Sequence, residues 1–133
     1  MPSKRKAKSA VGQLKTQATS SVGVIRDWWT KWPNALVGVP TGKSNGFTVL
    51  DVDKKNGVDG FETLINFGVN IESLDSPMVR TPTGGMHIYF RYSPTLKNSV
   101  SKIGPGLDVR NDGGYVIAAG EIQGLGKYEA RFR

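Results

Sequence analysis

Alternation of apolar and polar residues in three short segments limits the fold of this chain more than any other feature. The segments are FTVLDVD (47–53), MHIYFRY (86–92) and LDVR (107–110). Successive side chains of a β-strand point to opposite faces of a sheet, so each segment predicts a strand with one apolar and one polar face. Glycine-rich turns and one helical pattern separate them, and another helical pattern precedes them. We therefore expect an α+β fold, with a mixed or antiparallel sheet packed on helices.

The remaining elements follow from spacing and from turn residues. A helix is expected after the capping residues at 19–21, and its three tryptophans, which end at Trp32, are expected to pack in the core. A second helix is expected over 60–67, where Gly68 ends it. Strands are expected over residues 36–39, 47–53, 78–81, 86–92, 107–110, 115–119 and 128–132.

The positive charge of the chain is concentrated at its start. The formal charge is +7, and the first 26 residues hold six basic residues and no acidic one, which leaves +1 for the rest. We expect residues 1–17 to form a basic flexible arm and residues 18–133 to form one folded domain. Such an arm binds nucleic acid phosphates without sequence preference, and a solvated tail is an equally good interpretation. The candidate nucleic-acid-binding residues are Lys4, Arg5, Lys6 and Lys8.

Several classes of protein are excluded by what the sequence lacks. There is no cysteine, so disulfides, zinc fingers and thiol nucleophiles are excluded. No apolar run reaches about 18 residues, so a membrane-spanning helix and a membrane partner are not expected. No signal-peptide core follows the basic start, and we expect a cytoplasmic location.

Residues 40–53, PTGKSNGFTVLDVD, contain two candidate nucleotide-binding signals. Gly42-Lys43-Ser44 is similar to the end of a P-loop, but that loop needs a glycine where Val37 stands and a helix after Ser44. The residues after Ser44 instead predict a strand, so a P-loop is rejected. Lys43 and Ser44 stay candidates for contact with a nucleotide phosphate, and an ordinary turn is at least as good an interpretation.

The second signal is the pair Asp51 and Asp53, which share the polar face of one strand. His87 lies on the polar face of the second strand, and Asp108 and Arg110 lie on that of the third. A face that only meets solvent would carry scattered Thr, Lys, Ser and Glu, whereas this one collects three aspartates and the only histidine of the chain. Clustered carboxylates repel each other unless a cation neutralises them, and oxygen ligands without a thiol favour Mg²⁺ or Mn²⁺ over zinc.

Taken in order, these motifs resemble the bifunctional primase–polymerase (Prim-Pol) family of the archaeo-eukaryotic primase superfamily, in its plasmid, phage and prophage branch. The resemblance covers about residues 18–132 and implies a primase-like catalytic core with an RRM-like sheet. The matching segments are ATSSVGVIRDWWTKWP, VGVPTGKSNGFTVLDVD, TPTGGMHIYFRY, PGLDVRNDGGYVIAA and GKYEARF.

The resemblance also implies roles for single residues. His87 is expected to contact the phosphates of an incoming nucleotide. Gly85 stands where many relatives have serine, and a backbone N–H at Gly84 or Gly85 is expected to replace the hydroxyl. From the alternation we add Arg110 as a phosphate-binding residue. The expected catalytic metal ligands are Asp51, Asp53 and Asp108.

The activity implied by the resemblance is template-directed nucleotidyl transfer with two divalent metal ions, Mg²⁺ or Mn²⁺, in the replication of a mobile element. The expected partners are a single-stranded DNA template or primer–template, nucleoside triphosphates, and a helicase or other replication protein. Two alternatives stay open. One is a non-catalytic nucleotide- or DNA-binding module, to which Tyr89 and Tyr92 would contribute stacking rings. The other is a metal-dependent nuclease, although a single histidine does not fit the nickases that use paired histidines.

Overall fold

The structure is a computed structural model, and it describes residues 2–5, 8–9, 18–122 and 126–131. It confirms the α+β class, and every strand pair among these residues is antiparallel. The larger sheet has the order β12 (Gly120–Ile122), β13 (Gly126–Arg131), β7 (Met78–Arg80), β8 (Met86–Arg91), β4 (Phe47–Val52), β10 (Leu107–Arg110) and β9 (Ser99–Gly104). The smaller sheet has the order β11 (Tyr115–Ile117), β3 (Leu36–Pro40), β1 (Pro2–Arg5) and β2 (Lys8–Ser9). A separate hairpin consists of β5 (Lys54–Lys55) and β6 (Val58–Asp59).

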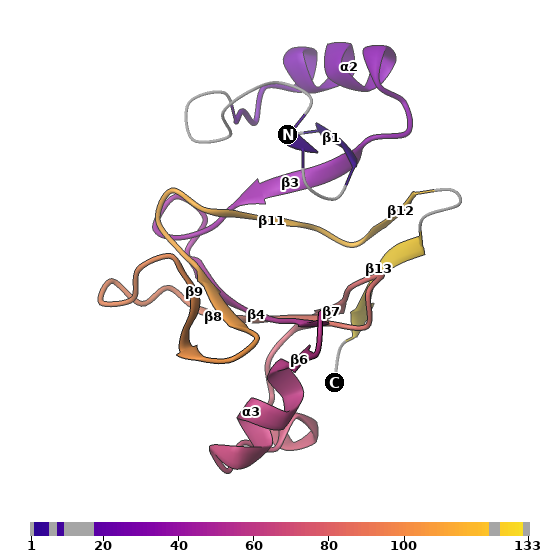
Figure 1. Cartoon of the computed structure of the whole chain (residues 1–133). Helices are drawn as coiled ribbons and strands as arrows, with labels where there is room; N and C mark the ends of the chain where they lie inside the picture. Colours follow the sequence, from indigo (N-terminus) through magenta and orange to yellow (C-terminus); the bar gives the residue numbers. More distant parts are fainter. Residues whose placement is uncertain (1, 6–7, 10–17, 123–125, 132–133) are drawn as a thin grey trace.

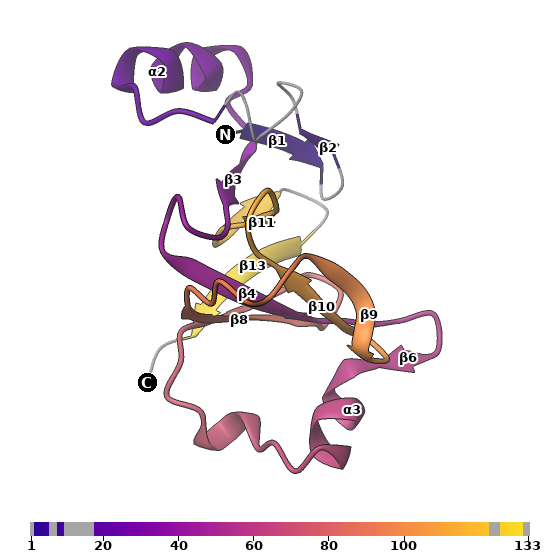
Figure 2. The same ribbon diagram turned by 90° about the vertical axis from the view of Figure 1, so that its left-hand side faces the viewer.

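The smaller sheet and helix α3 (Gly60–Asn66) lie on opposite sides of the larger sheet (Figures 1 and 2). Asp59 begins α3 as its N-cap, because its side chain accepts hydrogen bonds from the backbone N–H groups of Phe61 and Glu62. A 3₁₀ turn, η1 (Ile71–Ser73), follows the helix. The helix side of the larger sheet holds the main core, formed by Val52, Leu64, Met78, Met86, Ile88 and Leu107.

The other side of the larger sheet faces β3 and β11. A second, smaller apolar cluster lies there, formed by Leu36, Val79, Ile117 and Tyr128. It draws residues from both sheets, so it ties them together at one end of the space between them. The polar faces of β4, β8 and β10 are on this side, and the smaller sheet covers part of what the sequence alone would leave facing solvent.

Helix α2 (Val22–Lys31) begins at its N-cap Ser21, as the sequence predicts, but it is not part of the core. Trp28, Trp29 and Trp32 are only partly buried, and no residue of α2 is buried. The expectation that these tryptophans pack in the core is therefore wrong. The helix lies beyond the smaller sheet, at the far end from α3, and α3 already covers the apolar face of the larger sheet (Figure 1).

The seven strands predicted from the sequence are present as β3, β4, β7, β8, β10, β11 and β13, each within two residues of its predicted limits where the structure describes them. Residue 132, the predicted end of the last strand, lies outside the described residues. Strands β1 and β2 lie within residues 1–17, where an arm is expected, and β1 pairs with β3 through Pro2–Val37 and Ser3–Leu36. None of the described helices is long and apolar enough to cross a membrane.

Candidate metal and nucleotide site

Strand register places the predicted site residues side by side. Strand β4 lies between β8 and β10, and Asp51 is directly opposite His87 on one neighbour and Asp108 on the other. Directly opposed residues of antiparallel strands have Cβ atoms about 4.5–5.5 Å apart and share a face of the sheet. The neighbouring apolar positions, such as Leu50 opposite Ile88, therefore point to the helix side. The alternation in the sequence predicts this division of the two faces, and the structure has it.

The three aspartates form one cluster. Asp51, Asp53 and Asp108 each offer a carboxylate oxygen, and these oxygens lie within 4.8 Å of one another. Asp53 comes just after β4, where its backbone N–H donates to the carbonyl of Gly106 and its carbonyl accepts from Gly60, both at 2.8 Å. These two hydrogen bonds fix the backbone of Asp53 beside the cluster. The alternation predicts that Asp51 and Asp53 share a face, but it does not predict these backbone contacts.

The electrostatics of the cluster favour a cation. Burial, followed by the nearby charge of Asp53, raises the pKa of Asp51 from 3.8 to about 7. Asp108 raises it further, while Arg110 and Lys55 oppose the shift. Arg110 and Lys55 thus offset only part of the shift that burial and the two neighbouring carboxylates cause. Because the donors are carboxylate oxygens close enough to share one ion, the arrangement can hold a divalent cation.

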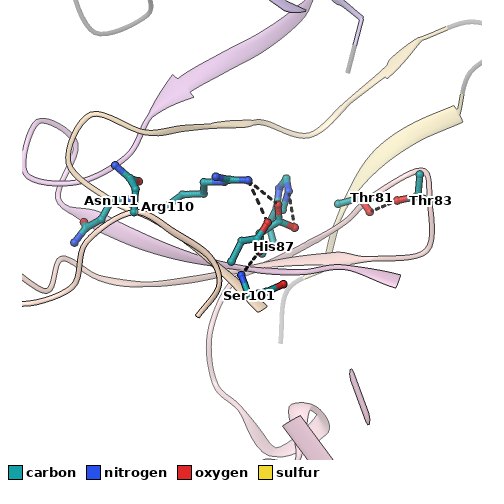
Figure 3. Close-up of polar contacts among 9 residues, drawn as sticks. Thr81, Thr83, His87, Ser101, Arg110 and Asn111 are labelled. Carbon is teal, nitrogen blue, oxygen red and sulfur yellow. Dashed lines mark hydrogen bonds and ion pairs between the residues drawn. The ribbon is translucent and has the colours of Figure 1, made fainter. Parts of the chain in front are cut away.

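Arg110 is the cation in direct contact with the cluster. Its guanidinium nitrogen donates to Asp108 Oδ2 at 3.3 Å and lies 3.9 Å from Asp51 Oδ2 (Figure 3). The alternation in LDVR predicts the shared face, and the structure places Arg110 there. About a third of the side chain is exposed, so the guanidinium borders the open space of the site.

His87 is buried between Asp51 and an aromatic ring that sequence reasoning missed. Its Nε2 lies 3.6 Å from Asp51 Oδ1, an ion pair when the imidazole is protonated (Figure 3). Its ring stacks with that of Tyr128 at a centroid distance of 5.9 Å and an interplanar angle of 30°. Tyr128 lies on the cleft side of β13, because it is two residues from Ala130, which is opposite Val79. Burial raises the pKa of the Tyr128 hydroxyl, and the charge of Asp51 adds to the effect.

Asp108 is held by the strand on its other side. Its Oδ1 accepts a hydrogen bond of 3.0 Å from the backbone N–H of Ser101 in β9. Ser101 has a positive φ of 52°, and the register of β9 against β10 shifts beside it. A β-bulge changes the direction in which backbone groups point, and here it accompanies the hydrogen bond from the Ser101 N–H to Asp108. Nothing in the segment SVSKIG predicts this contact, because it depends on the local bulge.

These residues border a cleft of about 730 Å³ between the two sheets. Its volume is in the range of pockets that hold small molecules and cofactors. Carboxylates, His87 and Arg110 line one wall, and Tyr115, Val116 and Ile117 of β11 line another. The remaining lining residues are Lys55, Thr81, Thr83, Asn98, Gly113, Gly114 and Tyr128.

Gly85 is buried directly before β8. A Cβ atom at this position would lie 2.4 Å from the carbonyl oxygen of Val52 and 3.0 Å from Thr81 Oγ1. A side chain here therefore requires a shift of backbone, which glycine avoids. Hydroxyls are still present nearby, because Thr81 and Thr83 line the cleft with their oxygens 3.4 Å apart.

Lys43 and Ser44 are exposed and are not among the residues that line the cleft. The backbone N–H of Lys43 donates to Asp112 Oδ1 at 2.8 Å, and the Tyr92 hydroxyl donates to Asp112 Oδ2 at 2.7 Å. These two bonds lower the pKa of Asp112 and fix the turn. Strand β4 follows the turn, in agreement with the rejection of a P-loop. A contact of Lys43 or Ser44 with nucleotide stays a prediction.

Near the turn, Asn111 is fully buried and joins three segments. It accepts a hydrogen bond from Thr48, and its side-chain amide donates to the carbonyls of Ser93 and Leu96. Its carbonyl accepts from Thr41. This network supports the end of β10 directly after Arg110, so Asn111 positions the site without contacting the carboxylates.

The predicted nucleic-acid-binding residues are in part described. Lys4 and Arg5 belong to β1, and Lys8 belongs to β2, while Lys6 lies outside the described residues. The backbone of β1 pairs with β3, and β3 pairs with β11, which forms a wall of the cleft. The role of these four residues stays a prediction.

Comparison with protein-family models gives a match over nearly the whole chain. The model described as "Bifunctional DNA primase/polymerase, N-terminal" (Prim-Pol) matches residues 1–132. The match includes residues 1–17, so the expected boundary between arm and domain stays a prediction. A search of curated proteins finds no match. The match covers essentially the whole chain and shows that the chain belongs to the Prim-Pol family of bifunctional DNA primase/polymerase N-terminal domains.

Proposed function

We propose that this chain is a DNA primase/polymerase core that catalyses template-directed nucleotidyl transfer. One observation carries the proposal: three carboxylates, from β4, from the residue just after β4 and from β10, meet in a cleft large enough for a nucleotide. The family match over residues 1–132 supports the class of reaction.

Asp51, Asp53 and Asp108 are the residues that would hold divalent metal. Their hard oxygen donors favour Mg²⁺ or Mn²⁺, and burial, followed by the charge of Asp53, raises the pKa of Asp51. When bound, two such ions would activate the attacking hydroxyl and stabilise the charge that develops on the transferred phosphate.

In the reaction, a 3′-hydroxyl oxygen forms a bond to the α-phosphorus of a nucleoside triphosphate. The bond from that phosphorus to the bridging oxygen breaks, pyrophosphate leaves, and the hydroxyl proton is released. Arg110 would exchange its carboxylate contacts for phosphate oxygens, to which guanidinium donates strong paired hydrogen bonds. His87, held between Asp51 and Tyr128, would face the same phosphates from a fixed position.

The partners follow from the reaction. A single-stranded template or primer–template and nucleoside triphosphates are the substrates, and replication of a mobile element with a helicase or other replication protein is the setting. Lys4, Arg5, Lys6 and Lys8 would bind DNA phosphates without sequence preference. The proposed location is the cytoplasm.

The test is an incorporation assay with Mg²⁺ or Mn²⁺, run with a primed and an unprimed template. Asp51→Ala and Asp53→Ala should each reduce incorporation by at least about 10²-fold, as the loss of a group that stabilises transition-state charge does elsewhere. Asp75→Ala is the matched control, because Asp75 is an exposed aspartate outside the cleft. Unchanged incorporation in either site variant contradicts the assignment. Nucleotide binding without incorporation by the wild type identifies a binding module, and metal-dependent strand cleavage identifies a nuclease.

A further inference from the structure

We propose that Lys55, on the β5–β6 hairpin, is a phosphate-binding residue that holds the triphosphate of the nucleotide in the cleft. The inference rests on the proposed function for the identity of the nucleotide. Its structural basis is separate from the carboxylate cluster and concerns a hairpin that none of the sequence motifs identified.

The hairpin has a defined shape. Lys54 pairs with Asp59 and Lys55 pairs with Val58. The turn between them is Asn56-Gly57, and both residues have positive φ, 53° and 76°. Two consecutive positive φ values at Asn-Gly are typical of the tight turn that matches the twist of a two-stranded hairpin. The backbone at Lys55 is therefore ordered by its own turn.

The base of the hairpin is fixed to the metal-site strand. The carbonyl of Asp53, one residue before β5, accepts from Gly60 directly after β6, at 2.8 Å. A Cβ atom at Gly60 would lie 2.4 Å from the carbonyl oxygen of Gly106, so the two backbones are in direct contact. Asp59 also begins α3 as its N-cap. Lys55 thus starts from a backbone held at both ends, two residues from Asp53.

The charge of Lys55 is available. Among the residues that the structure describes, Lys55 and Arg110 are the lysine and arginine that line the cleft. Arg110 contacts two carboxylates, whereas no ion pair within 4.0 Å joins Lys55 to an acid in the described part of the chain. Lys55 is exposed, and its charge still acts on Asp51 through space. A lysine ammonium near bound anions is a point charge that suits phosphate groups.

Position within the cleft favours the nucleotide over the DNA strand as the source of the phosphates. Lys55 lines the same cleft as the three carboxylates that would coordinate the triphosphate through metal. Its neighbour Lys54 has the same charge and exposure but is not a lining residue, because successive strand residues point to opposite sides. Lys54 therefore serves as a matched control for the loss of one positive charge on this hairpin.

The experiment measures binding of dATP and ATP, each with Mg²⁺, and separately of an oligothymidylate strand, by calorimetry on the full chain. Lys55→Ala should weaken binding of the tighter triphosphate by at least about tenfold, the usual loss for a hydrogen bond to a charged group. Lys54→Ala should change it by less than about twofold, and Lys55→Arg should restore most of the affinity because the charge is kept. Affinity for the oligonucleotide should fall by the same small factor in both alanine variants.

Three results would overturn the inference: equal loss of triphosphate affinity in Lys54→Ala and Lys55→Ala, loss of oligonucleotide affinity alone in Lys55→Ala, or no triphosphate binding by the wild type. Melting temperatures of the variants show whether each is folded, and both lysines are exposed. The readout is binding, so it does not depend on incorporation. A wild type that binds triphosphate through Lys55 but incorporates none would contradict the proposed function and leave this inference standing.

Discussion

The strands β8, β4 and β10, at the centre of the site, present opposite chemistry on the two faces of the larger sheet. On the helix side, Ile88 and Leu107 are almost completely buried among other apolar side chains. On the cleft side, one residue earlier or later, His87 and Asp108 are also buried, but among charges. Burial of an apolar group stabilises the fold, whereas burial of a carboxylate costs free energy unless a cation is near. The comparison indicates that the apolar face stabilises the fold and offsets the cost of burying charged groups on the cleft face.

The largest expected effect on stability comes from a change in the core on the helix side of the sheet. Ile88→Ala removes a side chain with 0% exposure in the centre of the core. We expect the free energy of unfolding to fall by about 2–5 kcal/mol, the range for such cavity-forming changes. Urea unfolding measures it. If the loss is under about 1 kcal/mol, the helix side does not carry the stability of the sheet.

A smaller effect on stability is expected from a change directly before β8, next to the backbone of β4. Gly85→Ser places a Cβ atom against the carbonyl of Val52, so the backbone must shift. We expect a loss of about 1–3 kcal/mol, as for other overpacked sites, together with weaker metal binding because β4 moves. Thermal unfolding and Mn²⁺ titration measure the two effects. Wild-type values for both would mean that the start of β8 yields easily.

The cleft side should be destabilising when no metal is present, in a pH-dependent way. The pKa of Asp51 is about 7 in the folded protein, whereas its ordinary value, taken for the unfolded chain, is 3.8. Between these pH values the folded protein therefore binds a proton that the unfolded chain does not. The contribution of Asp51 to stability is therefore present at low pH and lost as pH rises toward about 7, at up to about 1.4 kcal/mol per pH unit.

Unfolding in EDTA across pH 5–8 tests this sign. Asp51→Asn should remove most of that slope and make the metal-free protein more stable than wild type at pH 8. Added Mn²⁺ should reverse the order, because a cation favours the ionised carboxylate of the wild type. A variant that is less stable than wild type at pH 8 without metal would show that the buried carboxylate is stabilising.

The smallest expected effect lies outside both faces. Replacing Lys4, Arg5, Lys6 and Lys8 by glutamine should weaken binding of single-stranded DNA by a few-fold at low salt and hardly at all at high salt. Metal-dependent chemistry at saturating DNA should stay as in wild type. Binding measured over a range of salt concentrations checks the slope, and equal affinity of both proteins at every salt concentration would rule out a role for these residues.

The parts of the fold that could be predicted are those whose signal lies within one segment. Alternation in FTVLDVD and MHIYFRY located the central strands and assigned Asp51 and His87 to one face. It could not show that β3 and β11 cover this face, since that depends on pairings between distant segments. The expectation for the tryptophans in and after α2 is wrong for the same reason, because helical spacing predicts an apolar side of a helix but not what covers that side.

The sequence analysis does not predict the β5–β6 hairpin, strand β9 or the stacking of Tyr128, and only the hairpin has a clear sequence signal. The pair Asn56-Gly57 is a strong sign of a hairpin, and it would have located β5 and β6. Strand β9 gave no such sign, because it is an edge strand with mostly exposed residues and a bulge at Ser101. Tyr128 was predicted to lie in a strand, but its stacking on His87 depends on β13 pairing with β7 far earlier in the chain.

The position of Asp51 between His87 and Asp108 makes the site a sensor of how the sheet is assembled. A slip of one residue in β4 would turn Asp51 and Asp53 toward α3 and send Leu50 and Val52 into the cleft, which would separate these two carboxylates from Asp108. A cation that needs all three carboxylates would bind the correctly aligned sheet and not the sheet slipped by one residue, so it would favour the correct alignment by mass action. Metal in the medium would then favour the correct strand alignment during folding as well as take part in the chemistry.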